Sequence, residues 1–221
     1  MTDPRLLWWI DRSAGLVSLV MLSVVTVLGI LAAGRPRAAR GPRSFVQALH
    51  RQLSLVATVL LGVHIGAAVA DAFVPLRLVD VVVPFRAGYR PVWVGLGTLA
   101  LDLLVALVVT SLLRARLGRV GWRTVHWAAY ALWPLAVVHA LGSGNDLHAQ
   151  PVHLVGVVCV AMVLGGTGWR LIAGTGPAWV RTAGLVVLLA VTAVATGWAT
   201  QGPLVSGWAH RALAPVPWSL R

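Results

Sequence analysis

The sequence is poor in cysteine and in acidic residues. It contains one cysteine, six acidic residues and eighteen lysine or arginine residues, all of which are arginine. The single thiol, Cys159, excludes an internal disulfide and a cysteine-ligated metal cluster. Because it lies in an apolar run, we expect it to pack inside the protein. The chain also lacks a glycine-rich nucleotide loop, an internal repeat and a long polar linker, so we expect residues 1–221 to form one transmembrane domain.

Long hydrophobic runs make up most of the chain. Hydrophobic residues account for 58% of it, in six runs of about 18 residues or more, each long enough to cross roughly 30 Å of hydrocarbon. No secretory n-region with a cleavage site precedes the first run, so we expect that run to be retained. The runs predict an all-α polytopic membrane protein with six transmembrane helices, near residues 14–33, 46–73, 92–113, 122–142, 152–172 and 180–200.

The net charge of +12 is concentrated in short segments between these runs, which argues against a nucleic-acid-binding surface. Eleven arginines lie in or beside the first, third and fifth expected loops, and seven lie on the other side. Because positively charged loops stay in the cytoplasm, we expect those three loops inside and both termini outside. The longest outer loop, residues 71–91, contains the apolar run VDVVVPF, which we expect to lie on the membrane surface and cap an outer site.

Four histidines lie inside two of the expected helices. Thirteen residues separate His50 from His64 in the second helix, and twelve separate His126 from His139 in the fourth. An imidazole in lipid is costly unless it is paired or binds a metal, so these residues indicate a functional site. At about 1.5 Å per residue, each pair spans roughly 20 Å. That distance is too long for one metal ion and suits one haem near each membrane face.

Helix direction determines which histidines are partners. The second and fourth helices are two crossings apart and therefore run in the same direction, which predicts His50 with His126 near the cytoplasmic side and His64 with His139 near the outer side. Thirteen steps from His126 to His139 fall about 140° short of a whole number of turns, so we expect Pro134 to kink the fourth helix between them. With two histidines on each iron no axial position is open, which favours electron transfer over substrate binding.

Arginines near the histidines are candidate partners for haem propionates. Arg51 and Arg123 are placed for the inner haem, and Arg86 and Arg90 for the outer haem. For each arginine taken singly, a role in membrane topology or in contact with lipid headgroups is as good an explanation as a haem-propionate contact.

Small and aromatic residues also mark the expected haem sites. Gly62 and Gly66 flank His64 and leave room for a flat macrocycle or for ordinary helix packing. Trp133 lies seven residues beyond His126, on the same expected face and about 10 Å deeper. There it either fills the gap between two haems, opposite Ala57, or serves plain packing.

Four further polar residues have no assigned role. Asp102, inside the third expected helix, has three open interpretations: an acceptor that orients a ligand histidine, a member of a proton path, or a neutral structural acid. His148, His153 and His210 all fall on the expected outer side. They are either scattered interfacial residues or an outer metal or acceptor site.

The segments LHRQLSLVATVLLGVH and WRTVHWAAYALWPLAVVH resemble the paired-histidine helices of the ferric reductase-like transmembrane superfamily, over roughly residues 14–172. That superfamily includes NADPH oxidases, ferric reductases and the haem-binding membrane subunit of a bacterial methionine sulfoxide reductase system. The resemblance implies two b-type haems ligated by His50, His64, His126 and His139, with residues 180–200 as an additional helix. The absence of a Cys-x-x-Cys-His sequence agrees with non-covalent haem.

The oxidases and ferric reductases of this superfamily carry a flavin and nicotinamide domain, whereas about twenty residues follow the last expected helix here. We therefore expect electrons from a separate, acidic, cytoplasmic flavoprotein, steered by Arg43, Arg116 and Arg119, and an extracytoplasmic acceptor, in a bacterial inner membrane. One alternative is a quinol-linked membrane cytochrome that serves an extracytoplasmic reductase. Another is a haem-free transporter or structural subunit. The chain has an electron path without an evident substrate site, so its status as an enzyme is open.

Overall fold

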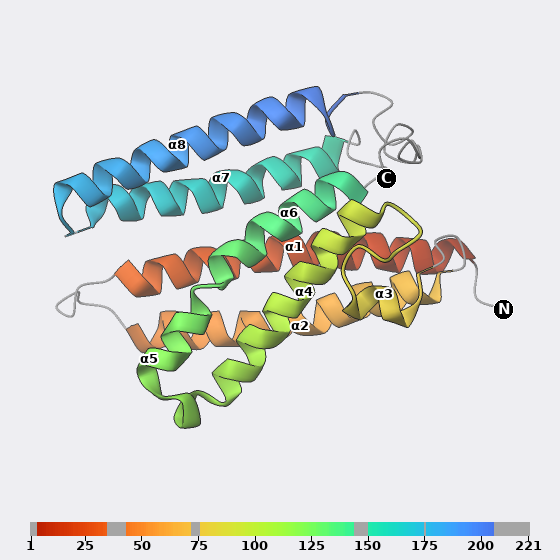
Figure 1. Ribbon diagram of the computed structural model, residues 1–221, viewed down its shortest axis with the longest axis horizontal. Coiled ribbons are helices and arrows are strands. Elements are labelled where there is room, and N and C mark those ends of the chain that lie inside the picture. The colour runs from red at the N-terminus through yellow and green to blue at the C-terminus, as the bar shows by residue number, and fades with distance from the viewer. Residues whose placement is uncertain (1–3, 35–42, 72–75, 144–149, 175, 206–221) are drawn as a thin grey trace. The chain divides into compact units, whose positions relative to one another are not determined.

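Figure 1 shows a computed structural model that describes residues 4–34, 43–71, 76–143, 150–174 and 176–205. Helices account for nearly all of these residues and none of them forms a strand, as the all-α prediction requires. The helices are α1 (Pro4–Gly34), α2 (Arg43–Ala70), α3 (Leu78–Val82), α4 (Pro91–Leu112), α5 (Arg114–His126), α6 (Ala129–Ser143), α7 (Gln150–Ala173) and α8 (Ala178–Gln201).

Five of the described helices, α1, α2, α4, α7 and α8, are long and apolar enough to cross a membrane. Their backbone polar groups pair within each helix, which lipid requires because it offers no hydrogen bonds. Several hydroxyls behave in the same way: those of Thr26, Thr58 and Thr110 each donate to a carbonyl four residues earlier. The chain is therefore a multi-pass membrane protein.

The expected fourth span, residues 122–142, is divided in the structure. α5 ends at His126, and the 15-residue apolar helix α6 begins at Ala129. Around this break the N–H groups of Ala128, Tyr130 and Ala131 each donate to a carbonyl three residues earlier, in a tighter turn than an α-helix. The count of six membrane-spanning helices is therefore not confirmed.

Two features of the sequence account for this division. α6 runs through Pro134, and the break lies earlier than the kink expected there. Proline has no N–H to donate to the Tyr130 carbonyl, and its ring crowds that carbonyl, which loosens the first turn of α6. α5 carries four arginines and no acid, a composition suited to the membrane surface and unsuited to the hydrocarbon.

The chain divides into two compact units, and the first comprises Met1–Asp71 with Gln150–Thr196. Within it, α1 packs against α2 and α7. Small side chains on these helices are buried, among them Ala14, Ser18 and Ala57, and they permit a close helix approach. Cys159 of α7 is a free thiol with only 1% of its surface exposed, in agreement with the packing role expected for it.

The second unit comprises Ala72–Ala149 with Gly197–Arg221, and α4 is its central helix. α4 packs against α3, α5 and α6. Part of the expected outer loop forms the short helix α3, whose side chains Leu78 and Val82 remain exposed. This exposure suits a segment at a membrane surface.

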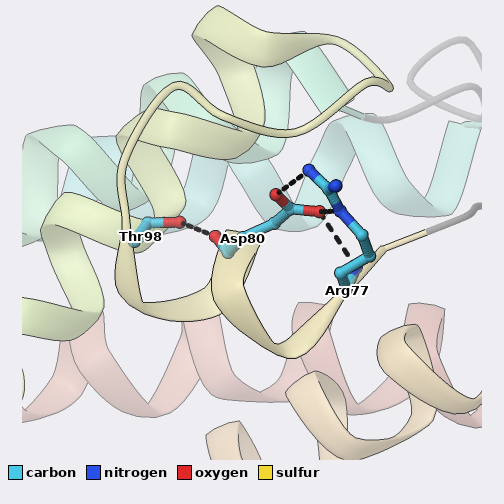
Figure 2. A network of polar contacts seen from close by, with 3 residues as sticks. All are labelled: Arg77, Asp80 and Thr98. Atoms are coloured by element: carbon cyan, nitrogen blue, oxygen red, sulfur yellow. Dashed lines mark hydrogen bonds and ion pairs between the residues drawn. The ribbon is translucent and has the colours of Figure 1, made fainter.

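A polar network fixes α3 to α4 (Figure 2). The backbone N–H of Arg77 donates to a carboxylate oxygen of Asp80 at 3.0 Å, and the Arg77 guanidinium donates to both oxygens, at 3.2 and 3.3 Å. The Thr98 hydroxyl donates to the Asp80 carbonyl at 2.9 Å. Asp80 therefore stabilises the start of α3 and joins the outer loop to the membrane-spanning helix.

Candidate functional site

His64 lies near the end of α2 and contacts the beginning of α1. Its Nδ1 atom is 3.0 Å from the backbone carbonyl oxygen of Asp11 and 2.8 Å from an oxygen of the Asp11 carboxylate. The imidazole packs against Gly15, one turn further along α1, where a Cβ atom would lie 2.9 Å from Nδ1. Asp11 and Gly15 thus form a seat for the ring on one face of α1.

His50 repeats this arrangement near the other end of α2. Its Nδ1 is 3.0 Å from the backbone carbonyl oxygen of Val25 on α1. The ring lies over Gly29, where a Cβ would be 3.4 Å from the imidazole. The spacing from carbonyl to glycine is four residues at both histidines, because residues four apart lie on the same face of a helix.

His139 on α6 has the same kind of support from α4. Its Nδ1 is 2.8 Å from the backbone carbonyl oxygen of Trp93. A Cβ on Gly97, four residues beyond Trp93, would lie only 2.5 Å from that nitrogen. The Ser143 hydroxyl is a second polar neighbour of Nδ1, at 3.3 Å.

These contacts determine which nitrogen of each ring carries the proton. A carbonyl oxygen only accepts hydrogen bonds, so Nδ1 of His50, His64 and His139 must be the donor. In the neutral imidazole the lone pair then belongs to Nε2, the nitrogen available to a metal. Metal-ligating histidines commonly donate their other N–H to a carbonyl or carboxylate in this way. Three of the four predicted ligands therefore have the support that a haem-ligating imidazole needs.

His126 is held differently. It is the last residue of α5, and its ring stacks on Trp122, with centroids 4.6 Å apart and planes inclined by 25°. The Arg114 guanidinium also lies over the Trp122 ring, with its central carbon 4.4 Å from the ring centroid. The Trp122 indole N–H donates to the Ser111 hydroxyl at 3.3 Å. An aromatic stack, together with the end of a helix, fixes this imidazole.

The predicted propionate partners differ in burial. Arg90 has 2% of its surface exposed, and its guanidinium donates to the Gly142 carbonyl of α6 at 2.7 Å, one turn beyond His139. Arg51, Arg86 and Arg123 are exposed. Arg90 is thus placed near the His139 end of the second unit, with its charge inside the protein.

The remaining predicted residues are placed as follows. Trp133 on α6 and Ala57 on α2 are buried, each within its own unit. Asp102 on α4 and His153 on α7 are exposed, and within the second unit the Trp93 carbonyl, rather than Asp102, accepts from Nδ1 of His139. His148 and His210 lie outside the described residues.

Sequence reasoning did not identify Asp11 or the three glycines under the imidazoles. A signal for them exists, because Asp11 and Gly15 are four residues apart at the start of an apolar run. The sequence does not show that Asp11 contacts His64, because the two residues are 53 positions apart.

Because His50 and His64 belong to the first unit and His126 and His139 to the second, the pairing across helices stays a prediction. The described residues contain no cluster of three or more histidine, cysteine or acidic side chains able to hold a metal ion. Axial ligation of haem requires no such cluster, since it takes single imidazoles from separate helices.

The chain resembles one curated protein over part of its length. It is 32% identical over 154 residues to an alpha-(1->6)-mannopyranosyltransferase A of Mycobacterium tuberculosis, an alignment that covers 59% of this chain and 29% of that protein. The chain thus spans less than a third of this relative. No solved structure matches the chain.

A family model gives the broader match. The model described as ferric reductase like transmembrane component matches residues 14–137, more than half of the chain. The matched segment includes His50, His64 and His126 and ends two residues before His139. With its membrane-spanning helices and carbonyl-supported histidines, the chain belongs to the ferric reductase-like transmembrane family.

Proposed function

We propose that this protein binds two b-type haems and carries electrons across the membrane. In this proposal His50 and His126 hold the inner haem, and His64 and His139 hold the outer one. When bound, each haem would supply a one-electron redox centre held by two of these imidazoles. The observation that carries the proposal is the donation from Nδ1 of three of these histidines to a carbonyl of the neighbouring helix.

The side chains around the histidines have supporting roles in this proposal. Each main-chain carbonyl orients its imidazole and increases its basicity, which strengthens the bond from Nε2 to iron. Arg51 and Arg123 neutralise the propionates of the inner haem, and Arg86 and Arg90 those of the outer haem. Trp133 would lie between the two haems and exclude water there.

The donor in this proposal is a separate cytoplasmic flavoprotein, and the acceptor is extracytoplasmic. A bacterial inner membrane is the proposed location. Membership in the ferric reductase-like family supports membrane electron transfer, while the choice of donor rests on the exposed arginines of α5. A membrane quinol is the alternative donor, and it would make the protein the cytochrome subunit of an extracytoplasmic reductase.

Haem stoichiometry tests the proposal most directly. A pyridine haemochrome assay on the purified protein should give close to two haems per chain, with a Soret band typical of low-spin b-type haem. A ratio near one means that one proposed pair is wrong. A protein without a Soret band is the haem-free transporter or structural subunit of the competing interpretation.

Single histidine variants test the pairing. His64→Ala and His139→Ala should remove the same component from a redox titration, and His50→Ala and His126→Ala should remove the other. Loss of one component by both His64→Ala and His126→Ala would contradict the proposed pairing.

A further inference from the structure

Asp11 gives His64 a carboxylate neighbour in addition to a main-chain carbonyl. Main-chain carbonyls of Val25 and Trp93 accept from His50 and His139. At His64 one residue presents two oxygens, its carbonyl at 3.0 Å and its carboxylate at 2.8 Å from Nδ1. The side chains are mostly buried, with 20% of His64 and 18% of Asp11 exposed.

The carboxylate is not needed to satisfy the imidazole. Nδ1 carries a single N–H, and the Asp11 carbonyl is already placed to accept it, as carbonyls do at His50 and His139. An aspartate in a membrane-spanning helix is costly and by default indicates function. What the side chain adds to the carbonyl is therefore negative charge beside the ring.

Charge beside a ligand imidazole changes the electron affinity of the metal it binds. A carboxylate next to Nδ1–H makes the imidazole a stronger donor through Nε2. In a partly buried site this charge also favours the more positive, oxidised iron over the reduced iron. Gly15 leaves space for the ring against this face of α1, since a Cβ there would lie 2.9 Å from Nδ1.

We propose that Asp11 is a positioning residue for His64, and that its carboxylate holds the haem ligated by His64 at a lower midpoint potential than a carbonyl alone would. This inference rests on the proposed function. It assigns an unequal environment to the two haems, because an acidic side chain supports one ligand of the outer haem while the Val25 carbonyl supports His50 of the inner haem.

The test compares Asp11→Asn with Asp11→Glu in the full-length, haem-loaded protein. Asn removes the charge and keeps the size, whereas Glu keeps the charge. In a redox titration, Asp11→Asn should raise the reduced-to-oxidised ratio of the His64 component about tenfold at a fixed potential. For a one-electron couple, this is a rise of roughly 59 mV in midpoint potential. Asp11→Glu should stay near wild type, and the component lost in His50→Ala should not move.

Asp102→Asn is the matched control, since it makes the same chemical change at an exposed position on α4, a helix of the other unit. Electron paramagnetic resonance of the ferric protein provides a second readout, in which the low-spin signal of the His64 component should change in Asp11→Asn only. If Asp11→Asn loses one haem and Asp11→Glu keeps both with the wild-type potential, the need for charge is supported as well.

Two results would overturn the inference: an unchanged potential in Asp11→Asn with both haems bound, or equal effects of Asn and Glu. Failure of the proposed function is a separate outcome. In that case the wild-type protein itself would lack two haems, before any variant is compared.

Discussion

Three candidate ligand histidines, His50, His64 and His139, each lie against a glycine on the neighbouring helix. In each case the glycine is one turn beyond the residue whose carbonyl accepts from Nδ1. The absence of a side chain lets the imidazole approach the helix closely enough to reach that carbonyl. Carbonyl and glycine together set the ring orientation, which makes the glycine a site where haem binding can be tested without removing a ligand.

Gly97→Ala tests this arrangement at His139. The new methyl group would lie 2.5 Å from Nδ1, so the ring must move away from the Trp93 carbonyl. We expect the haem content to fall from two toward one per chain, and crowding of this kind to cost about 1–3 kcal/mol of stability. Gly165→Ala on α7 is the control, because no neighbouring atom lies within 4 Å of its added methyl group. Equal haem content in the two variants would contradict the proposed role of Gly97.

Trp122→Leu tests the support of His126. Loss of the stacked ring should free the imidazole to rotate and weaken retention of the inner haem by up to roughly tenfold, since aromatic pairs contribute about 0.5–1.5 kcal/mol. Transfer of haem to excess apomyoglobin measures that loss. Trp127→Leu is the matched control, because Trp127 packs on Tyr130 and is largely exposed. Faster haem loss from the Trp127 variant than from the Trp122 variant would exclude the stack as the support.

At the scale of elements, α3 depends on one carboxylate. Hydrogen bonds from Arg77 lower the pKa of Asp80 below the value of about 4 that is ordinary for an aspartate. A lowered pKa means that the folded state favours the ionised carboxylate, so this contribution is full above the ordinary value and is lost as the pH falls through the lowered one. We expect residues 76–90 to loosen below about pH 4 and, in Asp80→Asn, already at neutral pH.

Amide hydrogen exchange across residues 76–90 measures this loosening. Exchange in α4 beyond Thr98 should change little, which separates release of the loop from global unfolding. Asp102→Asn again provides a control with the same chemical change. Wild-type exchange rates in the Asp80→Asn loop at neutral pH would show that the network in Figure 2 does not hold α3.

Hydropathy predicts five membrane-spanning helices well, because length and composition alone decide whether a helix can cross lipid. Expected and observed bounds of α4 differ by one residue at each end. At residues 122–142 the single helix expected from hydropathy is interrupted, because an apolar average does not register the turn at Trp127 and Ala128. That turn reflects two local features, the proline inside α6 and the arginines of α5. An average over the whole segment does not register such local features.

At the scale of the whole molecule, sequence spacing identifies the histidines but not what supports them. The four positions follow from the cost of imidazole in lipid, whereas Asp11, Val25 and Trp93 are close to them only through folding. Each acts partly through a main-chain carbonyl, which every residue type has, so no side-chain pattern could single out Val25 or Trp93. The pairing of histidines across the two units follows from helix direction, and remains to be tested by the histidine variants.

The distribution of charge over the molecule leads to a prediction about the electron donor. α5 carries Arg114, Arg116, Arg119 and Arg123, all exposed, without an acidic residue, and it ends at His126. An acidic flavoprotein approaching this surface is attracted over roughly 30 Å at about 0.01 M salt and over only roughly 3 Å at about 1 M salt. We expect Arg116→Gln with Arg119→Gln to slow haem reduction by such a donor by up to about tenfold at low ionic strength, and the difference to shrink as salt is added.

Stopped-flow reduction of the haem Soret band in inside-out vesicles measures this effect. Arg77→Gln is the control, since Arg77 is exposed, lies on the expected outer side and has no proposed contact with haem. Because steering acts on encounter, the variant should lower the second-order rate constant and leave the saturated rate unchanged. Equal rates in wild type and variant at every salt concentration would mean that the arginines of α5 only fix the topology. Rapid reduction by quinol without any flavoprotein would instead identify the membrane as the source of electrons.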